Sequence, residues 1–323
     1  MEGASWIRRW DKSGLPGLFL GHAVGMQMLE RAAILGVTGF VGRGLPVLLS
    51  KQGMASTGVS RAGTGTVPGV DAWQRTDALD FTGHDAVINL AGERIDQRWN
   101  EARRRLFHES RVGVTRRVVA ALARQAPEGR PRVLVNASAV GIYGDRGDEV
   151  LDESAPRGSG YLADLCDEWE CAADEAVALG VRVVKLRIGI VLGKNGPAFE
   201  KLRLVFKLGL GGRLGSGQQW MPWIHLADLR AAIVHAVFSQ SLCGAVNATA
   251  PEPERNVDFT RKLAAALHRP ALFPAPAFGL KLALGEFSSA LLAGQHALPA
   301  ALLADDFQFR FATLERALDD LLE

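Results

Sequence analysis

The chain has 323 residues, and 48% of them are hydrophobic, which is enough to form the core of one large domain or of two coupled ones. The formal net charge is only +2, so we expect no nucleic acid and no membrane as partner. Three cysteines, Cys166, Cys171 and Cys243, cannot form a disulfide framework, and no apolar run is long enough to span a bilayer. We therefore expect a globular, cytoplasmic protein with reduced thiols that is a monomer or a homodimer.

The first 30 residues precede the first strand-like run and are interpreted as an N-terminal extension. Arg8 and Arg9, followed by an apolar stretch, faintly resemble a targeting signal, but Pro16 and Gly17 interrupt it. The start could equally lie at Met26 or Met28. We expect the extension to be dispensable for the fold.

Short apolar runs alternate with helical patterns along the next part of the chain. The runs cover residues 32–35, 57–60, 85–90, 132–136, 181–186 and 245–247. Residues 86–88 and 133–135 are apolar without alternation, which indicates strands covered on both faces. This pattern predicts an α/β fold with a doubly wound parallel Rossmann sheet. We assign residues 31–195 to an NADP-binding domain, completed by about residues 225–250.

The remaining segments predict a smaller C-terminal substrate lobe. Glycines and tryptophans are dense in residues 209–223, and prolines in residues 251–276. We assign residues 196–224 and 251–323 to this lobe and expect it to lie over the carboxyl ends of the strands, where ligands bind in open α/β sheets.

Three glycines at a predicted strand-to-helix turn indicate a pyrophosphate site. The motif comprises Gly36, Thr38, Gly39, Phe40, Val41 and Gly42. Glycine permits a tight turn and lets a phosphate approach bare backbone. The alternative is a turn in which the glycines serve structure alone.

Ser60 and Arg61 follow the second predicted strand, where an NAD-binding fold usually presents an acidic side chain to the ribose. A guanidinium matches a 2′-phosphate in charge and geometry, so this position favours NADP(H). The alternative is a solvent-exposed loop arginine. Leu90, Ala91 and Gly92 follow the next predicted strand. Small residues in this segment would let the backbone approach the ribose and nicotinamide of the cofactor.

Six motifs together resemble a known family. In chain order they are GVTGFVG, NLAGE, NASAVGIYGDRGDE, LRIGIVLG, LGSGQQWMPWIHLADL and VNATAP. The chain resembles the extended short-chain dehydrogenase/reductases, and among them the "epimerase family" group that ends in a domain of unknown function, matched here by residues 270–322. The resemblance implies a Rossmann fold with NADP(H) and no settled substrate. It also implies that Arg187 and Ile190 lie beside the nicotinamide half of the cofactor, with strand-end packing as the alternative.

The catalytic residues of this family are only partly present. Active members use a Ser or Thr, and a Tyr followed four residues later by a Lys that lowers the tyrosine pKa. Tyr161 stands at the expected place, but position 165 is Leu165. Ser138 lies one residue before the expected serine, and Tyr143 is a second candidate phenol. Packing roles are the alternatives for Ser138 and Tyr143.

Further residues are candidates for substrate contacts, each with a structural alternative. They are Glu93, Arg98, Trp220, Trp223 and His225. Tryptophans beside a glycine-rich turn can stack on a flat or sugar-like ligand, although His225 is better explained by structural stabilisation. The histidines show no metal-ligand spacing. Arginines between residues 103 and 117 adjoin apolar residues at helical spacing and predict a solvated helix face.

Two functions remain open. The first is an NADP(H)-dependent oxidoreductase or epimerase acting on a small hydroxyl-bearing, carbonyl-bearing or sugar-nucleotide-like substrate. The second is a catalytically impaired NADP(H)-binding regulatory or scaffold protein, which the leucine at position 165 favours.

Overall fold

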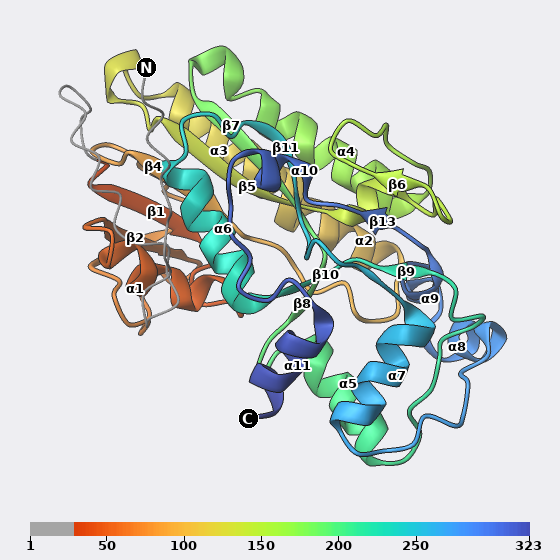
Figure 1. The fold of residues 1–323 in the computed structure, drawn as a ribbon. Helices are drawn as coiled ribbons and strands as arrows, with labels where there is room; N and C mark the ends of the chain where they lie inside the picture. Colours follow the sequence, from red (N-terminus) through yellow and green to blue (C-terminus); the bar gives the residue numbers. More distant parts are fainter. Residues whose placement is uncertain (1–28) are drawn as a thin grey trace, which may run out of the picture.

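The centre of the protein is a parallel sheet of seven strands, seen in a computed structural model that describes residues 29–323 (Figure 1). The predicted extension, residues 1–30, lies almost entirely outside the described residues. The strand order is β11-β7-β5-β4-β1-β2-β3, and every pairing is parallel. The strands are β1 (Arg31–Leu35), β2 (Ala55–Ser60), β3 (Ala72–Arg75), β4 (Ala86–Asn89), β5 (Val133–Ala139), β7 (Arg182–Ile188) and β11 (Gly244–Ala248).

Helices cover both faces of the sheet, as continuous hydrophobicity in the strands predicts. On one face, Ala32 and Ile34 of β1 pack with α1 (Leu45–Ser50) and α6 (Leu226–Phe238). On the other face, Ala33 and Leu35 pack with α3 (Val114–Ala123), and α4 (Tyr161–Asp174) lies beside it. The predicted doubly wound Rossmann sheet is confirmed. Strand β3 was not predicted, because it is short and its residues are half-buried or exposed at the sheet edge.

Helix α3 continues an earlier helix through an unusual turn. Helix α2 (Glu101–His108) is followed without a break by a π-helical turn, Glu109–Gly113, and then by α3. A π-helical turn widens the helix by one residue and is often found at functional sites. Here it directs Ser110 and Arg111 toward the end of β4, as described below.

A smaller lobe with its own core lies beyond the carboxyl ends of the strands (Figure 1). Its core contains Phe199, Trp223, Phe259 and Leu314 among other residues. The helices of this region are α5 (Pro197–Lys207), α7 (Asn256–Ala266), α8 (Ala277–Leu284), α9 (Phe287–Leu292) and α11 (Leu314–Leu322). Pairs of short strands connect it to the sheet: β8 (Ile190–Leu192) with β10 (Trp223–His225), β9 (Trp220–Met221) with β12 (Glu254–Arg255), and β6 (Val150–Leu151) with β13 (His296–Ala297).

One part of the predicted lobe returns to the sheet. Helix α10 (Ala300–Ala304) contacts β11, and Leu302 and Phe307 belong to the core that packs under the sheet. The C-terminal segment therefore contributes to both cores.

Candidate cofactor and active site

The glycine turn lies at the point where the strand order reverses. Strand β1 pairs with β2 on one side and with β4 on the other, and ligands of open α/β sheets bind beyond the carboxyl ends of the strands at such a point. Gly36 directly follows β1 with φ of +77°, a conformation that favours glycine. A Cβ atom on Gly36 would lie 2.8 Å from Leu90 O. Gly36 therefore allows the ends of β1 and β4 to approach each other closely.

The other two glycines of the motif have different surroundings. A Cβ atom on Gly42 would overlap with Gly36 O, so Gly42 is required for packing of the turn against itself. A Cβ atom on Gly39 would meet only Gly36 O within 4 Å, at 3.1 Å. Gly39 thus has open space on its remaining sides, as a backbone that a phosphate approaches needs.

Two arginines hold the backbone of this turn. Arg230 on α6 donates to Phe40 O and to Val41 O, both at 2.8 Å. Arg43 donates to Thr38 O at 3.1 Å. Sequence analysis missed Arg230, since it lies far along the chain from the motif and no local pattern connects them. Arg43 directly follows the motif and could have been considered.

The segment that follows strand β2 begins with an exposed arginine, Arg61. Arg61 is exposed and forms no hydrogen bond or ion pair with any of residues 29–323. Ser60 Oγ donates to Thr64 O at 2.9 Å and so fixes the start of the following loop. The nearby carboxylate of Asp77 is occupied by Arg75 at 2.7 Å. A free guanidinium thus stands where an NADP-binding fold would bind the 2′-phosphate.

The π-helical turn holds the segment after β4. Ser110 Oγ accepts from Glu93 N at 2.9 Å, and Arg111 donates to Glu93 O at 2.9 Å. A Cβ atom on Gly92 would lie 3.4 Å from the Arg111 guanidinium. Burial lowers the pKa of Arg111, which pairs with no carboxylate of the described chain. The predicted solvated arginine face is therefore incorrect for Arg111, which lies under Gly92 rather than in solvent.

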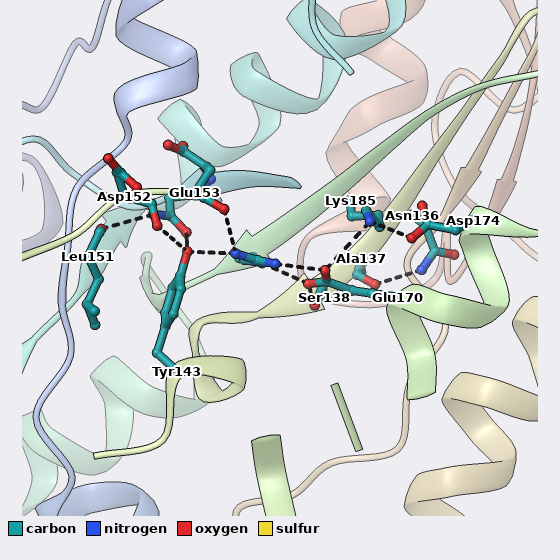
Figure 2. A network of polar contacts seen from close by, with 12 residues as sticks. Asn136, Ala137, Ser138, Tyr143, Leu151, Asp152, Glu153, Glu170, Asp174 and Lys185 are labelled. Atoms are coloured by element: carbon teal, nitrogen blue, oxygen red, sulfur yellow. Dashed lines mark hydrogen bonds and ion pairs between the residues drawn. The ribbon is translucent and has the colours of Figure 1, made fainter. Parts of the chain in front are cut away.

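Ser138 is buried in a polar network rather than exposed to a ligand (Figure 2). Its Oγ donates to Glu170 at 2.7 Å, and Arg187 binds both oxygens of Glu170, at 2.9 and 3.0 Å. Burial alone would lower the pKa of Arg187, but hydrogen bonds and the charge of Glu170 raise it. Ser138 and Arg187 are paired across β5 and β7, so both side chains reach the same α4 residue. Arg187 is thus packed at the end of strand β7, which is the alternative to a cofactor contact stated above.

Tyr143 belongs to the same network and is completely buried (Figure 2). Its hydroxyl lies 2.8 Å from Asn247 Oδ1 and 3.0 Å from Asp152 O, and it accepts from Arg187 at 2.9 Å. Burial raises the pKa of Tyr143 despite the opposing charge of Arg187. The Tyr143 side chain is therefore packed inside the protein, which is the alternative to a catalytic role stated above.

Tyr161 is the one half-buried group among the three candidate catalytic residues. Its ring lies 5.3 Å from Trp99, and the Arg104 guanidinium lies 4.5 Å above the ring. Burial raises the pKa of Tyr161 even though Arg104 and Arg111 act to lower it. Leu165 is buried among Phe107, Trp169 and other apolar residues. The chain therefore lacks the lysine at position 165, and among residues 29–323 the cations that act on the phenol, Arg104 and Arg111, do not offset the effect of burial on its pKa.

The candidate substrate residues fall into two groups. Glu93 is held by Arg111 in the segment after β4, and Arg98 approaches Gly285, which lies between α8 and α9. Trp220 stacks on His296 at 3.9 Å and is half-buried. These three side chains keep some exposed surface.

Trp223 and His225 are buried. Trp223 packs in the core of the lobe and donates to Glu252 O at 3.2 Å. His225 begins α6: its Nδ1 accepts from Ala227 N, and its ring lies 3.9 Å from Phe311. Both residues have the structural environment given above as their alternative. Ile190 on β8 is half-buried and packs against the core of the lobe.

Residues 29–323 contain neither a candidate metal site nor a candidate membrane span. No group of His, Cys, Asp and Glu side chains could hold a metal ion. No helix in this range is both long and apolar enough to cross a bilayer. The three cysteines are free thiols, of which Cys166 is buried.

Comparison with known proteins confirms the family resemblance. Residues 32–247 match the NAD dependent epimerase/dehydratase family, and residues 275–321 match a domain of unknown function, DUF1731. The Arabidopsis thaliana "Epimerase family protein SDR39U1 homolog, chloroplastic" is 37% identical over 300 residues, which cover 90% of this chain and 86% of the plant protein.

Two solved structures extend the comparison. The human epimerase family protein SDR39U1 (isoform 2), crystallised with NADPH, is 34% identical with a TM-score of 0.81, covering 90% of this chain and 99% of that one. A nucleoside-diphosphate sugar epimerase from Corynebacterium glutamicum is 31% identical with a TM-score of 0.73, covering 91% of this chain and 58% of that one. The chain therefore belongs to the NAD dependent epimerase/dehydratase family of extended short-chain dehydrogenases, in the epimerase family protein group with the C-terminal domain of unknown function.

Proposed function

We propose that this protein is an NADP(H)-dependent oxidoreductase or epimerase that acts on a small substrate carrying a hydroxyl or carbonyl group. The observation that carries the proposal is the glycine turn at the reversal point of the sheet, with open space at Gly39. Arg61, at the end of the neighbouring strand β2, forms no ion pair with any of residues 29–323. The related human structure with NADPH supports the choice of cofactor. When bound, NADP(H) would supply or accept the hydride.

The residues that would hold the cofactor come from three strand ends. Gly39 would leave room for the pyrophosphate, Gly36 and Gly42 would close the turn beside it, and Arg61 would bind the 2′-phosphate. Leu90, Ala91 and Gly92 would face the nicotinamide ribose, held in place through Glu93 by Ser110 and Arg111.

Tyr161 is the proposed proton donor. Ser138 and Tyr143 are buried and engaged by Glu170, Arg187 and Asn247, whereas the Tyr161 side chain retains exposed surface. A phenol whose pKa is raised stays protonated at neutral pH, so it can give a proton to a carbonyl oxygen but is a poor base. This arrangement supports reduction of a carbonyl more than oxidation of an alcohol.

The substrate lobe would bind the rest of the substrate. Arg98 and Trp220 keep exposed surface there, and the Trp220 ring also contacts His296, stacked at 3.9 Å, and the Arg255 guanidinium, 4.7 Å from the ring centre. The name of the C. glutamicum relative supports a sugar-nucleotide-like substrate as one member of this class.

A second function is supported by the same network. Leu165 replaces the family lysine, and two of the three candidate proton-transfer groups are occupied by structural hydrogen bonds. An NADP(H)-binding regulatory or scaffold protein needs only the cofactor site. It predicts cofactor binding without turnover.

Calorimetric titration of the purified protein with NADPH and NADH tests the cofactor site. We expect NADPH to bind at least about tenfold more tightly, because charged hydrogen bonds to the 2′-phosphate contribute roughly 1.5–3 kcal/mol. Arg61→Ala should remove most of this preference, whereas Arg116→Ala, on an exposed position of α3, should leave it unchanged. Equal affinities in the unmodified protein would refute the proposal.

A screen for carbonyl substrates separates the two functions. The protein is mixed with NADPH and candidate sugar-nucleotides, aldehydes and ketones, and loss of reduced cofactor is followed. Turnover that depends on substrate supports the enzyme. Tight NADPH binding with no turnover across the screen supports the regulatory protein.

A further inference from the structure

Acidic residues are missing from two long segments of the lobe. Residues 201–227 and 259–285 contain no Asp and no Glu, but both contain several Lys and Arg residues. The net charge of +2 for the whole chain therefore conceals a local excess of positive charge. A chain can be nearly neutral overall and still attract anions at one place.

These two segments lie side by side. Leu214 and Ala275 form a β-bridge, Ala275 N donates to Arg213 O at 2.9 Å, and Gly215 N donates to Ala275 O at 2.8 Å. The loop after α5 and the loop before α8 can be followed together at the lower right of Figure 1. Their charges and side chains therefore belong to one region of the surface.

Large apolar side chains are exposed in the same region. Phe278 and Leu282 on α8 are 76% and 77% exposed, and α8 has no buried residue. The others are Leu208, Leu210, Leu272 and Phe273, each more than 60% exposed. Elsewhere in residues 29–323, exposed apolar residues such as Val47, Val150 and Val177 are scattered singly. A concentration of this kind marks an interaction site.

Four cations in these segments have no acidic partner. Lys207, Arg213, Arg269 and Lys281 are exposed and form no ion pair with any residue that the structure describes. Other cations of the segments are paired: Lys201 with Asp96, Arg203 with Glu200, Arg261 with Asp258, and Lys262 with Glu254 and Glu315. Unpaired cations thus accompany the exposed apolar side chains.

We propose that this basic apolar face docks on the surface of an anionic lipid bilayer. The face is defined by Leu208, Leu210, Leu272, Phe273, Phe278 and Leu282 with the four unpaired cations. Apolar side chains would enter the boundary between headgroups and acyl chains, while Lys and Arg contact the lipid phosphates. Helix α8 has only 8 residues, so it lies on the membrane and does not span it. The proposal differs from the expectation of no membrane partner, which was drawn from the net charge of the whole chain.

Charge complementarity favours a lipid surface over other partners for the basic apolar face. A second copy of the chain, related by a two-fold axis, would bring the same unpaired cations into opposition, which costs free energy. A partner helix needs an apolar groove, whereas these side chains project from two loops and from a helix without buried residues. A bilayer offers anionic headgroups to the unpaired cations of the face and an apolar interior to its exposed apolar side chains.

Vesicle sedimentation with the full chain tests the proposal. Vesicles of phosphatidylcholine alone are compared with vesicles that contain phosphatidylcholine and phosphatidylglycerol in about a two-to-one ratio. We expect binding to the anionic vesicles, weakened as salt is raised. The double variant Phe278→Ser with Leu282→Ser should lower the partition coefficient at least about tenfold, because two inserted apolar side chains are lost. Arg269→Glu with Lys281→Glu should lower it by more than about tenfold.

Matched variants control for general effects. Val177→Ser changes an exposed apolar residue outside these segments, and Arg116→Glu changes an exposed cation on α3; both should bind vesicles as the unmodified protein does. All variants alter exposed residues, and circular dichroism with thermal melting verifies that they are folded. Two results would overturn the proposal: equal binding by the double variants and their controls, or no binding to anionic vesicles at low salt. Vesicle-free self-association that the Phe278 and Leu282 changes abolish would instead show that a second copy covers the face.

Discussion

Arg187 binds both carboxylate oxygens of Glu170, at 2.9 and 3.0 Å, and this buried pair connects the end of β7 to the middle of α4 (Figure 2). The pair also receives the Ser138 hydroxyl and contacts the Tyr143 hydroxyl. Two residues that resemble a dehydrogenase proton relay are therefore buried and hydrogen-bonded within the protein.

Breaking this pair should destabilise the fold strongly. Arg187→Met leaves Glu170 charged and buried, so the free energy of unfolding should fall by about 3–5 kcal/mol. The double variant Arg187→Met with Glu170→Met should recover part of this loss. Urea denaturation measures the change. Arg105→Met, which removes an exposed pair with Glu101, serves as the control and should change stability by less than about 0.5 kcal/mol. Equal effects of Arg187→Met and the control would contradict the prediction.

The three glycines of the turn should respond differently to alanine. Gly39→Ala adds a Cβ atom that meets only Gly36 O, so the protein should fold while NADPH affinity drops at least about tenfold. Gly39→Val should abolish binding. Gly42→Ala should instead lower the melting temperature, since its Cβ overlaps with the turn. Gly129→Ala, where a Cβ has open space, is the neutral control. A Gly39→Val variant that is folded and still binds NADPH would show that the turn is only structural.

Tyr161 should titrate above its ordinary pKa of about 10, because burial outweighs the charges of Arg104 and Arg111. The chain has only 2 tyrosines, so ¹³C labelling at the ring carbon bonded to oxygen gives two resolved signals. Tyr143→Phe assigns them. A Tyr161 signal that titrates near neutral pH would show that another group replaces the missing lysine. If the pKa of Tyr161 is raised as expected, Tyr161→Phe should lower turnover far less than the roughly hundredfold typical of losing an efficient general acid-base.

Restoring the family lysine should harm the fold. Leu165 is buried with Phe107, Val112, Trp169 and Ala172. In Leu165→Lys, an ammonium group would replace an apolar side chain there, so stability should fall by several kcal/mol or the lysine should lose its proton. Leu165→Met, which conserves volume, should cost less than about 1.5 kcal/mol. Chemical denaturation compares the two. A stable lysine variant with new carbonyl-reductase activity would show that the side chain can reach the proposed cofactor site.

His225 should make the protein sensitive to mild acid. Burial lowers the pKa of His225 to about 4, against the raising effect of Asp320. A lowered pKa means that the fold holds the neutral ring, so its stabilising contribution is present above about pH 6.5 and is lost as pH falls toward 4. His225→Asn keeps a helix-capping side chain without the titration. The stability difference between the two proteins should therefore change by more than about 1.4 kcal/mol across this range. Asp228, whose pKa burial raises to about 6, titrates in both proteins, so its contribution cancels in the stability difference. His268→Asn, at an exposed position, serves as the control.

The sequence by itself determined the sheet and the glycine turn. Continuous apolar runs indicate β1, β4 and the first half of β5, because a strand covered on both faces is apolar on both sides along most of its length. The glycine motif is equally local, since its backbone conformation and close contacts arise within a few residues. Strand β3 was not predicted, because a strand at the edge of the sheet does not need a continuous apolar run.

Only the tertiary structure decided which polar side chains meet. Arg230 reaches the glycine turn from α6, and Arg111 reaches Glu93 from a π-helical turn that shifts the helix by one residue. Ser138, Arg187 and Glu170 come together because the register of β5 and β7 sets two side chains against α4. The exposure of α8 is also a tertiary result, since its apolar sequence suits burial equally well. Contacts between distant residues depend on register, packing and the direction of each side chain, and none of these is fixed by a local pattern of residues.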